Sequence, residues 1–120
     1  MKYLLLIHVN PATWESLHEE ERNEVFRGHS EFVRATTESG EMVRTEALAD
    51  PSNSATVRVR GGVPAVTDGP YIEAKEFFSG YYLVDCESKE RAIELAARIP
   101  DARYAAIEVR PLMNQGGTEI

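Results

Sequence analysis

Cysteine and long apolar runs are scarce in this sequence. Cys86 is the single cysteine among 120 residues. No disulfide can therefore form within the chain, as expected in a reducing cytoplasm. The apolar opening, residues 1–7, is short and lacks a small-residue cleavage site, so we expect no signal peptide. No run approaches the roughly 20 apolar residues of a membrane span, and the sequence predicts a cytoplasmic protein that is not inserted in a membrane.

The sequence also lacks an excess of basic over acidic residues. Lysine and arginine number 13 against 20 acidic residues, which gives a net charge of −7. This balance argues against a nucleic-acid binder and against attraction to anionic lipid. The sequence contains no Cys/His cluster, no phosphate-binding loop and no Gly-x-Gly-x-x-Gly run, and we expect no cofactor. His18 and His29 would lie about 16 Å apart along one helix, too far to share a metal ion, so we expect no metal site.

Hydrophobic periodicity predicts a mixture of strands and helices. Strands are expected over residues 3–9, 42–48, 55–60, 63–66, 77–84 and 105–110, and helices over residues 19–39 and 88–99. Gly61 and Gly62 predict a hairpin turn, and residues 67–70 a compact turn. The order favours an α+β ferredoxin-like sandwich, with two helices on one face of a mostly antiparallel sheet. We expect one domain over residues 1–113 and a flexible tail over residues 114–120.

The other face of such a sheet would carry apolar side chains that nothing in the chain can cover. A second copy could bury them, so the pattern predicts a homodimer.

His29 is the most informative single residue of the sequence. It lies within an otherwise apolar helical stripe formed by Val25, Phe26, Phe32, Val33 and Thr36. An imidazole placed there needs a hydrogen-bond partner, since an unpaired buried polar group costs about 1–3 kcal/mol. A carboxylate partner would orient the ring for general base catalysis. A core histidine bonded to a backbone carbonyl is the other interpretation of this pattern.

Residues 66–76, Val-Thr-Asp-Gly-Pro-Tyr-Ile-Glu-Ala-Lys-Glu, resemble the signature of the YCII-related, DGPF-type family. Tyr71 replaces the usual phenylalanine of that signature. The opening strand, residues 28–32, residues 96–100 and residues 107–113 are similar to the family's other segments in the same order. The resemblance implies a dimeric α/β-barrel assembly of ferredoxin-like domains, and a cleft in which a histidine and an aspartate act together.

Asp68 of the Asp-Gly-Pro run is the partner that this resemblance implies for His29. A turn role, in which the Asp68 carboxylate accepts backbone N–H groups, is the other interpretation. Lys75 is a candidate for binding an anionic substrate or for a surface ion pair. Arg58 and Arg60 share one strand face and form a second candidate anion site, and His8 is a candidate for lining the same cleft.

Three functions remain open on the sequence. One is a small-molecule lyase or hydrolase that uses His29 and Asp68 as a dyad. The second is a non-catalytic dimeric module that binds a ligand or a protein, linked to sigma-factor regulation as the resemblance implies for part of the family. The third is a purely structural dimer.

Overall fold

The computed structural model describes residues 1–72 and 75–116. Its elements are β1 (Lys2–Val9), α1 (Pro11–Ser16), α2 (Glu19–Glu38), β2 (Met42–Ala47), η1 (Pro51–Asn53), β3 (Ala55–Arg60), β4 (Val63–Asp68), β5 (Phe77–Asp85), α3 (Lys89–Ala97), η2 (Pro100–Arg103) and β6 (Ala106–Pro111). The expected strands and helices are present, with bounds that shift by a few residues.

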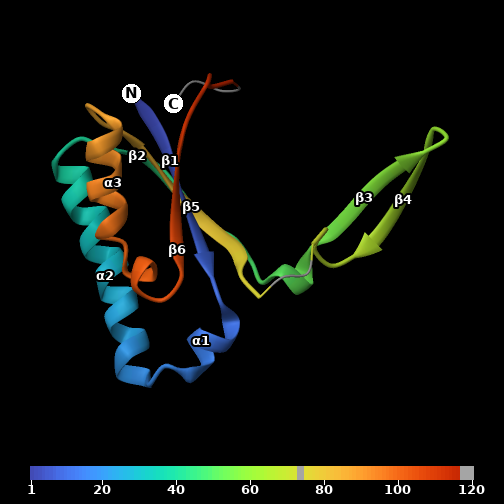
Figure 1. Cartoon of the computed structure of the whole chain (residues 1–120), viewed down its shortest axis with the longest axis horizontal. Coiled ribbons are helices and arrows are strands. Elements are labelled where there is room, and N and C mark those ends of the chain that lie inside the picture. The colour runs from blue at the N-terminus through green and yellow to red at the C-terminus, as the bar shows by residue number, and fades with distance from the viewer. Residues whose placement is uncertain (73–74, 117–120) are drawn as a thin grey trace.

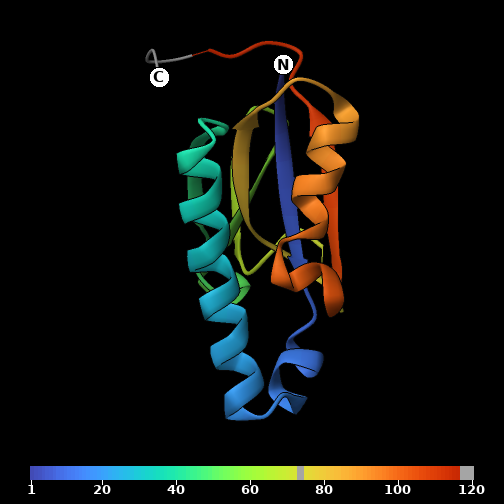
Figure 2. The same ribbon diagram turned by 90° about the vertical axis from the view of Figure 1, so that its left-hand side faces the viewer.

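Four strands form one open antiparallel sheet in the order β2-β5-β1-β6. Helix α2 connects β1 to β2, and α3 connects β5 to β6. Both helices lie on the same face of the sheet (Figures 1 and 2). The predicted α+β class, with a mostly antiparallel sheet and two helices on one face, is therefore confirmed.

The core lies between this sheet and the two helices. Strand β1 alternates, so that Tyr3, Leu5 and Ile7 are buried while the side chains between them are only half-buried. Phe32 of α2 packs on the Tyr82 ring with centroids 4.6 Å apart. Burying such a side chain contributes about 1.5–3 kcal/mol. The alternation leaves Leu4, Leu6 and His8 on the face that no helix covers, called here the open face.

Phe26, which was predicted to belong to the buried stripe of the helix, does not face the sheet. Val25, Phe32 and Thr36 are buried in α2, but Phe26 is 59% exposed. Phe26 follows Val25 by one position, about 100° around the helix, so it turns away from the sheet. It packs edge-on against Trp14 of α1 instead, with centroids 5.6 Å apart.

The hairpin differs from its prediction at one end. Strands β3 and β4 pair only with each other, and Gly61 and Gly62 turn the chain with φ of +57° and +76°. Strand β4 continues through Asp68, whose backbone pairs with Ala55. Thr67 and Asp68 were expected in a turn, and this prediction is wrong because the ladder of the hairpin extends over them. The two strands project from the sheet (Figure 1).

An ion pair ties α3 to the start of β2. The Arg91 guanidinium donates two hydrogen bonds of 2.9 Å to the Glu41 carboxylate, and both side chains are mostly buried. Arg91 holds the pKa of Glu41 below its usual value.

Replacing Glu41 with glutamine should lower the free energy of unfolding by about 1–2 kcal/mol at neutral pH, because a charge-assisted bidentate contact is lost. A carboxyl with a lowered pKa stabilises the fold above its ordinary pKa, and that stability is lost as the pH falls below about 4.5. Urea unfolding at pH 7 and pH 3 measures both. The difference between the wild type and Glu41→Gln should shrink at the lower pH, and an unchanged difference would contradict the assignment.

None of the described helices is long and apolar enough to cross a membrane.

Candidate active site

His29 is held between two side chains that the sequence did not single out. Its Nδ1 lies 2.7 Å from the Tyr82 hydroxyl, and its Nε2 contacts Oδ1 of Asp101. The His29 side chain is 28% exposed and that of Asp101 is 13% exposed, so the contact is partly shielded from water. The three residues come from α2, β5 and η2, and they are called here the Asp101–His29–Tyr82 triad.

The partners decide where the proton of a neutral His29 ring lies. An ionised carboxylate only accepts hydrogen bonds, so Nε2–H donates to Asp101. Nδ1 then carries the lone pair and accepts the Tyr82 O–H. A carboxylate on one side of an imidazole fixes the tautomer and stabilises the imidazolium that forms when the ring takes a proton.

Tyr82 is held in its protonated form. Burial in the core, together with the negative charge of Asp101, raises the pKa of Tyr82 to about 12. The phenol is thus neutral at physiological pH, with its O–H directed at His29. Tyr82 therefore donates a hydrogen bond to His29 in the resting site. When His29 accepts that proton, the Tyr82 oxygen can take another one in its place.

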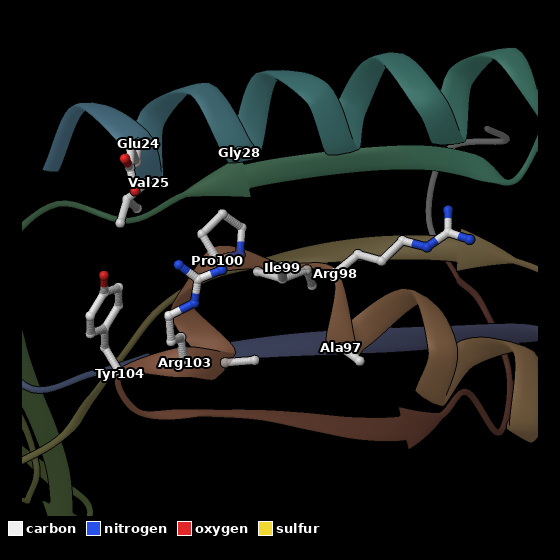
Figure 3. Close-up of a pocket in the computed structure, with 10 residues that line it drawn as sticks. Glu24, Val25, Gly28, Ala97, Arg98, Ile99, Pro100, Arg103 and Tyr104 are labelled. Atoms are coloured by element: carbon white, nitrogen blue, oxygen red, sulfur yellow. The ribbon is translucent and has the colours of Figure 1, made fainter. Parts of the chain in front are cut away.

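A close contact between α2 and η2 brings His29 and Asp101 together. The Pro100 ring lies against α2 at Gly28 (Figure 3), and a Cβ added to Gly28 would come within 2.3 Å of Pro100 Cγ. Gly28 and Pro100 are the chain neighbours of His29 and Asp101. Only glycine therefore allows η2 to approach α2 closely enough for the carboxylate to reach the imidazole.

The triad borders a small cavity of about 230 Å³ beside β2, the edge strand of the sheet. Besides the triad, it is lined by Ile7, Thr45, Glu46, Ala47, Ser79 and Gly80. At Gly80 the strands approach so closely that a Cβ would lie 2.7 Å from the carbonyl oxygen of Glu46. No arginine or lysine is among the described residues that line this cavity. The groups that line it, an imidazole, a phenol, two hydroxyls and two carboxylates, can accept and donate protons.

The structure does not bring His29 and Asp68 together within the chain. Both ring nitrogens of His29 have other partners, and Asp68 ends β4 of the projecting hairpin. The carboxylate beside His29 is that of Asp101. His8 lies on the open face and lines a groove at the base of the hairpin, and it also borders a very small cavity that Asp101 lines as well.

The three predicted cations also lie away from the triad. Arg58 and Arg60 are exposed on β3, and Lys75 is exposed between β4 and β5. The Arg58 guanidinium lies 5.0 Å from the centre of the Tyr71 ring, a cation–π contact. A role of these cations in substrate binding stays a prediction.

Two side chains of the triad were missed for identifiable reasons. Tyr82 lies in an aromatic-rich strand and reads as an ordinary core residue. Asp101 follows Pro100 after a helix, where an aspartate usually belongs to a turn.

Neighbouring η2 residues line a second groove of about 430 Å³ against α2, which also contains Arg98 and Arg103 (Figure 3).

Two other kinds of site, a metal site and a reactive cysteine, find little support in the described part of the chain. Among the described residues, no group of three or more histidine, cysteine or acidic side chains could hold a metal ion. Cys86 is buried, and burial raises the pKa of its thiol, which disfavours the nucleophilic thiolate.

Comparison with known proteins agrees with the signature in residues 66–76. A family model of the YCII-related domain matches residues 1–115. The chain is also 32% identical over 114 residues to "Uncharacterized protein R00369" of Rhizobium meliloti (strain 1021), an alignment that covers 93% of this chain and 92% of that protein. The expected family is therefore confirmed, and the chain is a member of the YCII-related domain family.

Proposed function

We propose that the protein is an acid–base enzyme that acts on a small organic molecule at the Asp101–His29–Tyr82 triad. The observation that carries the proposal is the pairing of both His29 ring nitrogens, one with a carboxylate and the other with a phenol. A buried histidine with a structural role also pairs both ring nitrogens, so the support comes from the chemistry of the two partners. His29 has the carboxylate that orients a general base and a hydroxyl that can pass a proton on.

In the proposed reaction Tyr82 and His29 act as a proton relay, which moves two protons in one step. Tyr82 takes the proton from a substrate C–H, or from a water molecule, as its own proton passes to Nδ1. The imidazolium that forms lies beside the Asp101 carboxylate, which offsets its charge. In an elimination, the electrons of the broken C–H bond form a double bond and expel the leaving group. In a hydrolysis, the deprotonated water attacks the substrate, and both reactions fit the same groups.

A non-catalytic binding module is the second candidate. The cavity beside the triad, about 230 Å³, is smaller than the usual ligand pockets of about 300–1,000 Å³, which weighs against a small-molecule substrate there and favours a module that binds a protein. The sigma-factor association implied by the family resemblance would belong to this candidate.

A homodimer of ferredoxin-like domains, joined through their sheets, is part of both candidates. Leu4 and Leu6 are only half-buried on the open face, and Phe78 on the same face is 40% exposed. A second copy would remove these side chains from water. The single cysteine is buried and unpaired, which suits the cytoplasm as the place of action.

A ligand screen on four proteins tests the proposed site. Thermal shifts with small organic acids and aromatic metabolites would be recorded for the wild type, His29→Ala, Asp101→Asn and Asp68→Asn. A ligand of the site should stabilise the wild type and Asp68→Asn but not the other two variants. Turnover of that ligand should fall at least about tenfold in Asp101→Asn.

The variant Asp68→Asn is the matched control, because it removes the carboxylate that the family resemblance indicated. Equal loss of binding in Asp68→Asn and Asp101→Asn would show that the hairpin takes part in the site. Loss in Asp68→Asn alone would contradict the proposed triad.

A further inference from the structure

The groove of about 430 Å³ between α2 and η2 is not used by the proposed chemistry (Figure 3). Its volume is within the usual range of small-molecule pockets, about 300–1,000 Å³, unlike that of the cavity beside the triad. Gly28 and Pro100, which pack on each other, are among its lining residues, whereas His29 and Asp101 are not. The groove is therefore a site separate from the triad.

Most of the lining of this groove is apolar. Val25 of α2 and Ile99, between α3 and η2, line it and are only 5% and 1% exposed, so both belong to the core. Ala97, Pro100 and Ala102 add small or rigid apolar surfaces. A ligand with an aliphatic or aromatic body would remove these surfaces from water, which favours binding.

Two opposite charges lie at one end of the groove. Figure 3 shows Glu24 of α2 at the same end as Arg103, the last residue of η2, and Tyr104. None of the ion pairs in the described part of the chain includes Glu24 or Arg103. The Tyr104 hydroxyl can donate or accept a hydrogen bond. Both charges and this hydroxyl are therefore available to a ligand.

The second arginine of the groove, Arg98, points toward the opposite end (Figure 3). The hydrogen bonds of Arg91 are the main cause of the lowered pKa of Glu41, and the positive charge of Arg98 adds to it. Arg98 therefore lies near the Glu41–Arg91 ion pair. The two arginines of the groove do not converge on a single anion.

This arrangement fits a small zwitterion better than a simple anion. A carboxylate bound by Arg103 would also lie near the negative charge of Glu24, and like charges repel. An ammonium group on the same ligand would pair with Glu24, so that each charge of the groove meets its opposite. A free α-amino acid carries both groups on one carbon atom, and an aliphatic or aromatic side chain gives it an apolar body.

We infer that the groove between α2 and η2 binds a free α-amino acid with an apolar side chain. The carboxylate of the ligand accepts hydrogen bonds from Arg103, its ammonium group donates to Glu24, and its side chain packs on Pro100 and Ile99. Such a ligand joins α2 to η2 and so holds in place the segment that carries Asp101. The inference does not rest on the proposed chemistry, because the triad does not line the groove.

Isothermal titration of the full chain with leucine, methionine and phenylalanine tests the class of ligand. At least one of them should bind with a Kd below about 1 mM. For the tightest of them, two analogues each lack one charge, namely the deaminated acid and the decarboxylated amine. Each analogue should bind at least about tenfold more weakly than the amino acid. Absence of binding by all three amino acids, or equal binding of the amino acid and the deaminated acid, would overturn the inference.

Three exposed positions locate the bound ligand. Arg103→Gln should weaken the amino acid and the deaminated acid at least about tenfold, and Glu24→Gln should do the same to the amino acid and the amine. Arg98→Gln is the matched control, because it removes an arginine from the other end of the same groove, and its affinity should stay near the wild-type value. Melting temperatures without ligand check that the variants are folded. Equal losses in Arg98→Gln and Arg103→Gln, or a loss in His29→Ala instead, would place the ligand elsewhere and contradict the inference.

Discussion

Replacing Gly28 with alanine should lower the free energy of unfolding by about 1–2 kcal/mol, although alanine is the better helix former. Alanine gains about 0.5–1 kcal/mol over glycine inside a helix. Its Cβ would lie 2.3 Å from Pro100 Cγ, and overpacking of this kind costs about 1–3 kcal/mol. We expect the clash to dominate, because the Pro100 ring is rigid. As η2 moves away from α2, Asp101 should also leave His29.

A double-mutant cycle with Pro100→Ala separates the two effects. Pro100→Ala removes the Cγ atom, so in that background Gly28→Ala should become neutral or stabilising. The coupling free energy from urea unfolding of the four proteins should be about 2 kcal/mol. Additive effects of the two changes would show that the Gly28–Pro100 contact does not position η2.

The second large effect is an alkaline loss of stability that depends on Tyr82. The unfolded chain releases the Tyr82 proton near pH 10, whereas the folded chain holds it to about pH 12. A group whose pKa is raised by folding loses its stabilising contribution as the pH rises through this interval. The shift from 10.0 to about 12 corresponds to about 2–3 kcal/mol. Below pH 10 the contribution of Tyr82 should not vary with pH.

Urea unfolding between pH 9 and pH 12 checks this expectation. Tyr82→Phe should lose about 2–3 kcal/mol less than the wild type across the interval. Tyr71→Phe is the matched control, because it removes an exposed phenol, and its curve should follow that of the wild type. If all three proteins lose the same stability, Tyr82 is not held protonated by its surroundings.

The elements of the fold were predictable because each has a strong local signal. The alternation around Leu5 identifies β1, Gly61 and Gly62 identify the hairpin turn, and Ser88 caps α3 by accepting a hydrogen bond from the Arg91 N–H. Phe26 was misplaced because a helical stripe is wide enough to admit a neighbour about 100° away. The end of β4 was misplaced because Asp-Gly-Pro is common in turns, and strand pairing across the hairpin extended past that signal.

The site was only half predictable from the sequence. His29 interrupts an apolar stripe, and that contrast is visible in one segment. Its partners lie 53 and 72 residues further along the chain, and no local pattern connects them to α2. They meet because β5 lies beside β1 in the sheet and because η2 packs on Gly28. Such contacts are properties of the topology, which explains why the sequence did not indicate Asp101, whereas Asp68 was named only because of the family resemblance.

The most direct test of the triad is the tautomer of the His29 ring. Long-range proton–nitrogen NMR spectra in mildly alkaline buffer report which ring nitrogen carries the proton, and the His29 signals are those absent from His29→Ala. We predict a single Nε2–H tautomer in the wild type and a mixture of tautomers in Asp101→Ala. An Nδ1–H tautomer in the wild type, or identical spectra of the wild type and Asp101→Ala, would contradict the triad and the function proposed from it.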